Sequence, residues 1–320
     1  MSKPVLWITR KLSAATEARA AQDYQIILNP EDGEHSADDI IAMSAKVDGI
    51  VPCHSEKFTK HVVAHLDTRL KIVANHSVGV DHCALEAFRD RGIVVTNTPD
   101  VLSDATAELT FTLLLGAARR AGEGDRLIRA GQWDSWSPSF LVGAQTTGKR
   151  LGILGLGRVG RVVARRARGF EMAVHYHNSK RLPPELEEGA VYHETFESLM
   201  SVSDFLTLHC PVTDRTRGIM SKDAFGHLPD GAVFVNAARG DLVDEEALIG
   251  ALASGKLAAA GLDCFLKEPG GNPKLAAYDN VFMTPHIGSA TKDTRDAMGF
   301  RALDNLDAFF AGRAPGDRVA

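Results

Sequence analysis

The sequence predicts an α/β protein with two doubly wound parallel sheets. Two series of short β-rich runs alternate with helical stretches, and a glycine-rich turn at Gly155–Gly160 stands between the first strand and the first helix of the second series. Such alternation forms parallel sheets that helices cover on both faces. The length of 320 residues fits two domains of ordinary size.

The first series occupies the N-terminal part of the chain and ends just before a turn at Asn97–Asp100. The expected strands are Val5–Thr9, Ile26–Leu28, Gly49–Val51, Lys71–Ala74 and Ile93–Thr96. The expected helices are Glu17–Gln22, Asp38–Ala45, Thr59–His65 and Cys83–Arg91.

A long apolar helix is expected from Asp104 to Arg120, with Ser103 or Asp104 as its N-cap. The helix is apolar nearly all round, which is typical of burial at a domain or subunit boundary. Gly131–Trp136 follows it and contains two of the three tryptophans. Tryptophan is favoured at interfaces, although an ordinary packed loop explains this segment equally well.

The second series begins at Leu151 and is followed by an amphipathic C-terminal helix at Thr291–Phe310. The expected strands are Leu151–Leu154, Ala173–Tyr176, Phe205–His209, Ala232–Asn236, Ala259–Asp263 and Val281–Thr284. The expected helices between them are Arg161–Arg168, Phe196–Val202, Ser221–Phe225 and Glu245–Ala253.

Composition excludes several classes of protein. The net charge of -5, without long runs of like charge, argues against nucleic-acid binding. No apolar stretch reaches the length of a membrane span, and the N-terminus is typical of a first strand rather than a signal peptide. The four scattered cysteines form no disulfide framework, so we expect a cytoplasmic protein. No His, Cys and carboxylate grouping has metal-ligand spacing, so no metal is expected.

The string Gly155-Leu156-Gly157-Arg158-Val159-Gly160 follows an apolar strand and opens a helix. The first glycine allows a tight turn, the second lets the backbone approach a pyrophosphate, and the third lets the helix pack on the strand. The helix amides then face the phosphates. An ordinary glycine turn is the alternative, but the strand before and the helix after favour a Rossmann-like dinucleotide site.

The next strand ends at Tyr176, and no carboxylate follows it. The residues there are His177, Asn178, Ser179, Lys180 and Arg181. An Asp or Glu would bind the ribose hydroxyls of NAD(H), whereas cations and polar donors attract the 2′-phosphate of NADP(H). NADP(H) is therefore the preferred cofactor and NAD(H) the alternative, unless Lys180 and Arg181 are only solvated turn residues. The Tyr176–Lys180 spacing resembles that of short-chain dehydrogenases, but its place at this strand end argues against that family.

Three chemically useful residues, Arg239, Glu268 and His286, each follow a predicted strand. Because ligands bind beyond the carboxyl ends of strands in an open parallel sheet, these residues can reach one site although they are far apart in sequence. Each alone has an ordinary explanation, as a surface ion pair, a loop carboxylate or a buried histidine. Beside a dinucleotide they form a usable set of a cation, a carboxylate and an imidazole.

Longer strings of residues support one family. They are the glycine string, Asn75–His82, Leu208–Pro211 with Thr213 and Thr216, Asn236–Gly240, Gly261–Phe265 before Glu268-Pro269, and Pro285–Thr291. On these strings the chain resembles the D-isomer-specific 2-hydroxyacid dehydrogenases over almost its whole length. It is most similar to their bacterial glyoxylate/hydroxypyruvate reductase branch.

The resemblance implies that Arg239, Glu268 and His286 are catalytic. Arg239 would pair with the substrate carboxylate and polarise the carbonyl, and His286, oriented by Glu268, would donate a proton as hydride arrives. The further substrate contacts it implies are Ser77, Val78, Gly79, Trp136 and, unless it is simply exposed, His54. The cofactor contacts it implies are Thr106, Gly155, Gly157, Arg158, Val159, Gly160, His177, Asn178, Ser179, Lys180, Cys210, Pro211, Thr216, Ala237, Gly288 and, at the nicotinamide carboxamide, Asp263.

The resemblance also implies the domain organisation. A discontinuous substrate domain, residues 1–99 and 288–320, is expected, with an NADP-binding domain, residues 100–287, inserted into it. The catalytic residues are expected in the cleft between the two domains. A homodimer is expected through the region Asp104–Trp136.

The expected reaction is reduction of glyoxylate, hydroxypyruvate or a similar small 2-keto acid to a D-2-hydroxy acid by NADPH. Larger 2-keto sugar acids stay open as substrates. Relatives that oxidise formate carry glutamine at the position of Glu268, which argues against formate, whereas the catalytic residues alone do not exclude phosphite oxidation. A dinucleotide-sensing transcriptional corepressor is the alternative function, and turnover of a keto acid distinguishes the two.

Overall fold

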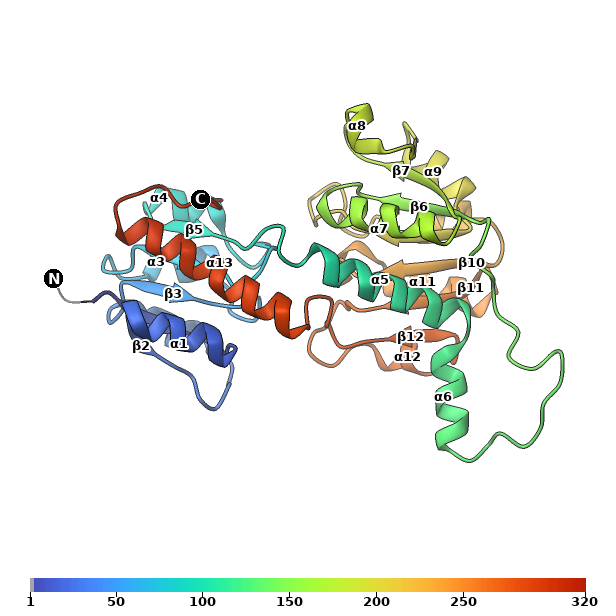
Figure 1. Ribbon diagram of the computed structural model, residues 1–320, viewed down its shortest axis with the longest axis horizontal. Helices are drawn as coiled ribbons and strands as arrows, with labels where there is room; N and C mark the ends of the chain where they lie inside the picture. The colour runs from blue at the N-terminus through green and yellow to red at the C-terminus, as the bar shows by residue number, and fades with distance from the viewer. Residues whose placement is uncertain (1–2) are drawn as a thin grey trace. The chain divides into compact units, whose positions relative to one another are not determined.

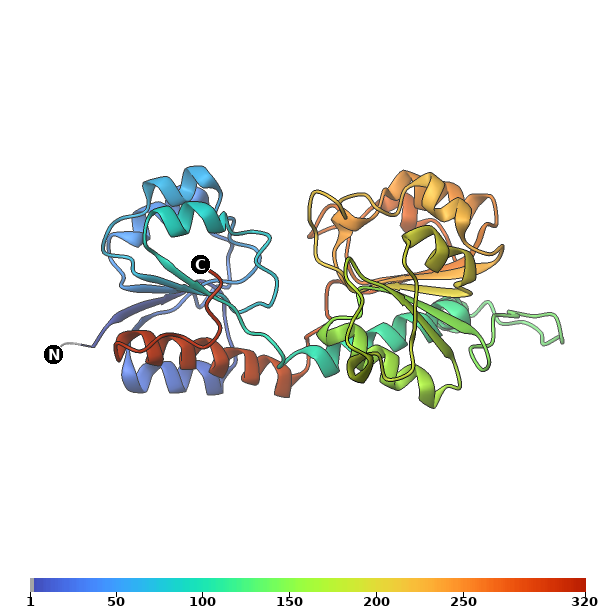
Figure 2. The same ribbon diagram turned by 90° about the horizontal axis from the view of Figure 1, so that it is seen from above.

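The computed structural model describes residues 3–320, which form two units. One unit comprises the chain up to Leu102 together with Ser289–Ala320, and the other comprises Ser103–Gly288. Each unit has its own parallel sheet with helices on both faces (Figure 1 and Figure 2). The predicted α/β class with two doubly wound parallel sheets is confirmed.

The sheet of the first unit has the strand order β2-β1-β3-β4-β5. Its strands are β1 (Val5–Ile8), β2 (Gln25–Ile27), β3 (Gly49–Val51), β4 (Ile72–Ala74) and β5 (Val94–Thr96). Its helices are α1 (Ala14–Asp23), α2 (Ala37–Ser44), α3 (Lys60–His65), α4 (Leu85–Asp90) and α13 (Lys292–Phe310).

Alternation along the strands explains how this unit buries both faces of its sheet. In β1, Leu6 and Ile8 pack among residues of α1 and α13, whereas Trp7 packs on the opposite side among residues of α2, α3 and α4. Helix α13 contributes Ala302 and Leu306, one turn apart on the same face, to the first of these clusters. The last helix of the chain therefore completes the core of the first unit.

The sheet of the second unit has the order β12-β11-β10-β9-β6-β7-β8. Its strands are β6 (Arg150–Leu154), β7 (Ala173–His177), β8 (Val191–Tyr192), β9 (Phe205–Leu208), β10 (Ala232–Asn236), β11 (Leu257–Leu262) and β12 (Val281–Met283). Its helices are α5 (Ser103–Ala118), α6 (Ala121–Arg129), α7 (Arg158–Gly169), α8 (Pro184–Glu187), α9 (Phe196–Val202), α10 (Lys222–His227), the 3₁₀ helix η1 (Gly240–Leu242), α11 (Glu245–Ala253) and α12 (Pro273–Ala276).

Helices α5 and α7 cover one face of the second sheet, and α9, α10 and α11 cover the other. The strand order reverses between β6 and β9, because β7 and β8 lie on one side of β6 and β9 to β12 on the other. In open α/β sheets, ligands bind beyond the carboxyl ends of the strands at such a reversal. The glycine turn after β6 lies at this position.

The predicted long helix differs from the structure at both ends. Helix α5 already includes Ser103, so neither Ser103 nor Asp104 stands outside it as an N-cap. It ends at Ala118 rather than Arg120, because Arg120 has a left-handed backbone with a φ of 52° and turns the chain into α6, a helix that the sequence did not predict. Among residues 3–320, no helix has the length and apolar character needed to cross a membrane.

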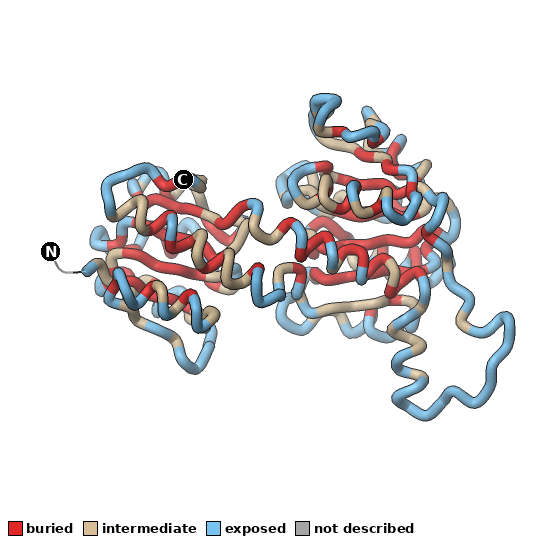
Figure 3. The backbone as a smooth tube through the Cα atoms, in the orientation of Figure 1, coloured by how far each residue is buried: buried red, intermediate tan, exposed pale blue. Residues whose placement is uncertain are grey.

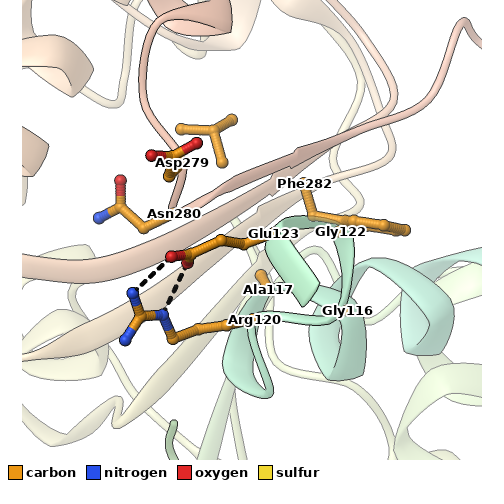
Figure 4. A pocket seen from close by; sticks show the side chains of 9 residues that line it. Gly116, Ala117, Arg120, Gly122, Glu123, Asp279, Asn280 and Phe282 are labelled. Atoms are coloured by element: carbon orange, nitrogen blue, oxygen red, sulfur yellow. Dashed lines mark hydrogen bonds and ion pairs between the residues drawn. The ribbon is translucent and has the colours of Figure 1, made fainter. Parts of the chain in front are cut away.

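The joint between α5 and α6 is closely packed on β12. The ring of Phe282 lies so near Gly116 and Gly122 that a Cβ atom on either glycine would lie 2.7 or 2.8 Å from it (Figure 4). Arg120 and Glu123 form an ion pair at the same joint, with both N–O distances at 2.8 Å (Figure 4). Glycine is required at both positions because any side chain would displace the ring.

Substitution of Gly261 in β11 is expected to destabilise the second unit. A Cβ atom there would lie 2.7 Å from the carbonyl oxygen of Leu113 in α5, so Gly261→Ala must push the helix away from the sheet. We expect a loss of about 1–3 kcal/mol in the free energy of unfolding, measured by urea denaturation. Gly250→Ala in α11 is the matched control, because no atom lies within 4 Å of its added Cβ. That variant should gain about 0.5–1 kcal/mol from helix propensity. Equal stability of the two variants would contradict the close approach of α5 to β11.

Candidate active site

The three predicted catalytic residues follow neighbouring strands of the second sheet. Arg239 follows β10, Glu268 follows β11 and His286 follows β12, and these strands pair in that order. All three therefore stand on loops at the carboxyl ends of adjacent parallel strands.

Glu268 and His286 are in direct contact. The Nδ1 atom of His286 lies 2.6 Å from Oε2 of Glu268, and the other carboxylate oxygen accepts a hydrogen bond of 2.8 Å from the backbone N–H of Phe265. Both side chains are partly exposed. A carboxylate on one ring nitrogen fixes the orientation of the imidazole. The pair has the arrangement of a proton donor and the group that orients it.

His286 occupies a strained position that Asp263 holds in place. Its backbone φ is 52°, in the left-handed region that residues other than glycine rarely adopt. The buried carboxylate of Asp263 accepts hydrogen bonds from the Thr284 hydroxyl (2.6 Å), the Ile287 N–H (2.8 Å) and the Gly288 N–H (2.9 Å). Burial raises the pKa of Asp263, and these donors oppose that rise. The sequence indicated Asp263 only as a cofactor contact, whereas the structure shows that it also fixes the turn of His286.

The loop of Arg239 is joined to the loop of Glu268 through the backbone. A Cβ atom on Gly240 would lie 2.0 Å from the carbonyl carbon of Phe265, so only glycine allows the two loops to touch there. Asn236 fixes the other side of the Arg239 loop, because its side chain donates to the Arg239 carbonyl (2.8 Å) and accepts from the Ala238 N–H (3.0 Å). The Arg239 and Glu268 loops thus form one packed body.

The three glycines of the turn after β6 have three different surroundings. Gly155 has a φ of 100°, and a Cβ atom on it would lie 2.6 Å from the Cys210 N atom. A Cβ on Gly160 would lie 2.3 Å from the Gly155 carbonyl oxygen, whereas a Cβ on Gly157 would meet no described atom within 4 Å. Gly157 is also the N-cap residue of α7 and, as a glycine, has no side chain that could bind the first N–H groups of the helix. An open glycine at an uncapped helix N-terminus fits a dinucleotide pyrophosphate.

The two predicted cations beyond β7 differ in their surroundings. Arg181 forms an ion pair of 2.7 Å with the buried Glu187, which also accepts a hydrogen bond of 2.6 Å from Tyr176. The hydrogen bonds from Arg181 and Tyr176 lower the pKa of Glu187 to about 2, so the carboxylate neutralises Arg181. Lys180 is exposed and makes no ion pair with residues 3–320. Of the two cations, Lys180 is the one with an uncompensated charge.

The remaining predicted cofactor residues lie at or beside the same edge of the second sheet. Asn178 braces the glycine turn, because its Oδ1 atom accepts a hydrogen bond of 2.7 Å from the Leu156 N–H. Thr216 closes the loop after β9 by donating a hydrogen bond of 2.7 Å to the Pro211 carbonyl. Burial raises the pKa of the Cys210 thiol to about 11, so this cysteine stays protonated and is no nucleophile. Thr106 lies beside Gly288, with its side chain 3.6 Å from a Cβ atom built on that glycine. The others are Arg158 and Val159 at the start of α7, His177 at the end of β7, Ser179 just beyond it, and the buried Ala237 after β10.

In the first unit, the predicted substrate loop Ser77–Gly79 follows β4. The Ser77 carbonyl accepts a hydrogen bond of 3.0 Å from the Thr98 N–H, the Val78 carbonyl accepts one of 2.9 Å from Asn97, and the Gly79 carbonyl accepts one from the Ser77 hydroxyl. Within residues 3–320, the N–H groups of Val78 and Gly79 have no hydrogen-bond acceptor. The loop therefore offers donors, as a carboxylate would require.

His54 is exposed on the loop after β3, which is held by a buried carboxylate that the sequence analysis missed. Glu56 accepts hydrogen bonds from the Thr9 hydroxyl (2.7 Å), the Cys53 N–H (2.9 Å) and the Ser55 hydroxyl (2.8 Å). The sequence signal that could have indicated Glu56 is an acidic residue shortly after a predicted strand. Acidic side chains are rarely buried inside a protein unless they are paired.

Trp136 stands after α6, which follows the end of α5 that is distant from Gly288. Thr106, near the start of α5, lies beside Gly288, and the stretch of α5 from Thr106 to its end at Ala118 carries the chain about 18 Å away from that point. Trp136 follows α6 in an exposed segment (Figure 3) and has 74% of its surface accessible. Its apolar neighbours in this segment and in α6 are Leu127, Ile128, Trp133, Phe140 and Leu141, which line one hollow with it.

Comparison with known proteins shows the family. A family profile described as D-isomer specific 2-hydroxyacid dehydrogenase, NAD binding domain, matches residues 111–288. The chain is 41% identical to a glycerate dehydrogenase of Hyphomicrobium methylovorum over 98% of both chains. It is 39% identical to a glyoxylate reductase of Pyrococcus furiosus, covering 98% of this chain and 94% of that one.

A solved structure of a related enzyme is also similar to this chain. An NADPH-dependent glyoxylate/hydroxypyruvate reductase of Sinorhizobium meliloti, in complex with NADP and malonate, is similar with a TM-score of 0.88 and 31% identity, covering 100% of this chain and 97% of that one. The glycine turn fits a nicotinamide dinucleotide, the kind of cofactor named for the matching family domain and for the Sinorhizobium reductase. The chain therefore belongs to the D-isomer-specific 2-hydroxyacid dehydrogenase family, as the sequence motifs predicted.

Proposed function

We propose that this enzyme reduces small 2-keto acids, represented by glyoxylate and hydroxypyruvate, and that it uses NADPH in preference to NADH. The contact of 2.6 Å between Glu268 and His286, in a turn that Asp263 fixes, is the observation that carries the proposal. It supplies an oriented imidazole after β12. Glu268 follows the neighbouring strand β11, and Arg239 follows β10, the next strand of the sheet. The similarity to glyoxylate reductases and a glycerate dehydrogenase supports the same substrate class.

The proposed chemistry divides between the cofactor and three side chains. The bound nicotinamide supplies the hydride. Arg239 binds the substrate carboxylate through its planar fork and polarises the keto group. Glu268 accepts the hydrogen bond from His286 Nδ1–H, so that Nε2 is the ring atom that donates a proton to the keto oxygen. In the oxidative direction, neutral His286 accepts the proton of the hydroxyl group.

We propose that the glycine turn and the first turn of α7 hold the pyrophosphate, and that Asp263 and Gly288 lie at the nicotinamide end. Lys180, assisted by His177, Asn178 and Ser179, would bind the 2′-phosphate of NADPH. The uncompensated charge of Lys180 supports this assignment, whereas the charge of Arg181 is neutralised by Glu187.

We propose that the N–H groups of Val78 and Gly79 bind the substrate carboxylate and that His54 faces the remainder of the substrate. The engaged carbonyls of this loop support the first assignment. For Trp136 we propose a contact with substrate in a second copy of the chain, within a homodimer formed through the exposed apolar segment after α6. The large accessible surface of Trp133 and Trp136 supports this arrangement.

A panel of keto acids tested with both cofactors examines the proposal as a whole. We expect oxidation of NADPH in the presence of glyoxylate and hydroxypyruvate, and slower oxidation of NADH. Keto sugar acids and, in the oxidative direction, phosphite belong in the same panel. Binding of the dinucleotide without turnover of any of these compounds would overturn the proposal and favour a sensing protein.

Replacement of His286 is expected to abolish the chemistry but not cofactor binding. His286→Ala should lower kcat for hydroxypyruvate by about 10²–10⁴-fold, because the proton donor is lost. Glu268→Gln should lower it less, and the double variant should be no slower than His286→Ala, because the two residues act as a unit. Steady-state kinetics and fluorescence titration with NADPH measure these effects. Wild-type turnover by His286→Ala would refute the assignment.

Replacement of Lys180 is expected to change cofactor selectivity. Lys180→Ala should lower kcat/KM for NADPH by about tenfold, which corresponds to about 1.4 kcal/mol, and leave that for NADH unchanged, because only NADPH carries the 2′-phosphate. Lys149→Ala is the matched control, since Lys149 precedes β6 at the opposite edge of the sheet. An equal loss with both cofactors would show that Lys180 does not recognise the phosphate.

Introduction of a charge into the exposed apolar segment is expected to dissociate the dimer. Trp133→Asp should halve the mass measured by sedimentation velocity, because a buried unpaired carboxylate opposes association. Val191→Asp places the same charge on another exposed apolar residue, in β8, and should leave the mass unchanged. A monomeric wild-type protein with full activity would contradict both the dimer and the role of Trp136.

A further inference from the structure

The side chain of Glu245 lies outside the loop that carries Glu268 and binds both ends of that loop. This residue is the first of α11, and its Oε1 atom accepts a hydrogen bond of 2.9 Å from the Leu266 N–H. Its Oε2 atom accepts a hydrogen bond of 2.7 Å from the side-chain amide of Asn272. Leu266 and Asn272 stand on either side of Glu268 in the sequence, so a single carboxylate ties both ends of the loop.

Glu245 itself occupies a fixed position. Asp244 caps α11 by accepting hydrogen bonds of 3.1 Å from both the Glu246 N–H and the Ala247 N–H. Leu248 and Leu252 of the same helix are buried in the core beneath the sheet. The carboxylate of Glu245 therefore projects from a rigid helix end rather than from a loop.

Besides Glu245, the Glu268 loop is contacted by Gly240 at Phe265 and by His286 at Glu268. Residues 266–270 are exposed, and the hydrogen bonds within the loop are those from the Phe265 N–H to Glu268 (2.8 Å) and from the Gly271 N–H to the Lys267 carbonyl (2.9 Å). Neither of these bonds joins the loop to a helix or a strand. Exposed segments open most readily, so the anchor supplied by Glu245 contributes to how firmly Glu268 is placed.

We propose that Glu245 is a positioning residue that keeps the Glu268 carboxylate against Nδ1 of His286 by holding Leu266 and Asn272. Its kinetic consequence rests on the proposed function of the Glu268–His286 pair. Two acceptor oxygens are needed for two donors, which explains a carboxylate at this position. A glutamine would keep one acceptor and lose the other. A displacement of about 1 Å at a reacting group can cost about 10²-fold in rate.

The neighbouring Glu246 provides a matched control. It lies on the same turn of α11 and also pairs across to α12, with a distance of 2.6 Å to Lys274. Both partners are about two-thirds exposed, and within residues 3–320 neither side chain forms a hydrogen bond with the Glu268 loop. Removal of Glu246 therefore removes the same charge from the same helix end without releasing the loop.

The first test compares steady-state kinetics of the two full-length variants with NADPH and hydroxypyruvate. Glu245→Ala should lower kcat by about tenfold or more with an unchanged KM for NADPH, and should raise the solvent deuterium isotope effect, because proton donation by His286 becomes slower. Glu245→Gln should recover part of kcat, since its carbonyl oxygen still accepts from Leu266. Glu246→Ala should match the wild type. Equal kinetics of Glu245→Ala and Glu246→Ala would overturn the proposal.

The second test does not require turnover. Amide hydrogen exchange measured by NMR should show faster exchange at Phe265 as well as at Leu266 in Glu245→Ala. The Phe265 N–H donates to Glu268 rather than to Glu245, so its exchange reports release of Glu268 itself. Faster exchange at Leu266 alone would show that Glu245 holds the backbone without positioning Glu268, and would overturn the proposal.

A further variant keeps the test decisive if Glu245→Ala does not fold. Asn272→Asp retains the oxygen that caps α12 but replaces the donor to Glu245 with a like charge, so it should reproduce the slower kcat and the faster exchange. Failure of the wild-type enzyme to reduce any keto acid would refute the proposed function. Exchange at Phe265 would still report separately whether Glu245 positions Glu268.

Discussion

Direct contact between backbones is the constraint on which the second unit depends. Gly155 touches the loop after β9, Gly240 touches the loop after β11, and Gly261 touches the backbone of α5, at distances that leave no room for a Cβ atom. Protein interiors are close-packed and transmit displacement rather than absorb it. The loops after different strands consequently behave as one body, and side chains far apart in sequence acquire fixed relative positions.

Buried carboxylates complete this arrangement in both units. Asp263 and Glu56 each accept three hydrogen bonds from loop donors at the ends of strands. Such burial is costly for an isolated charge, but it is offset when each oxygen is satisfied. The strained backbone of His286 persists because the carboxylate of Asp263 accepts hydrogen bonds from the N–H groups of the next two residues, Ile287 and Gly288.

Sequence reasoning predicted what depends on local pattern and missed what depends on distant partners. The strands and most helices follow from runs of apolar residues and from turn signals, and Arg239, Glu268 and His286 could be selected because each follows a strand. Helix α6 was not predicted, because it is short and two of its nine residues are glycines, which are poor helix formers. The neutralisation of Arg181 by Glu187 and the two hydrogen bonds of Glu245 were not predictable, since each joins residues whose burial and direction only the folded chain reveals.

The place of α13 in the chain has a consequence for synthesis on the ribosome. Ser103–Gly288 is one continuous segment and can complete its core as soon as it has emerged. The first unit cannot, because α13 covers Leu6 and Ile8 of β1 together with α1, and the Val95 N–H of β5 donates to the carbonyl of Ala320. The unit whose strands are made earlier is therefore the unit that finishes folding later. Until α13 is made, one apolar face of its sheet is only partly covered, and exposed apolar surface of this kind is what chaperones recognise.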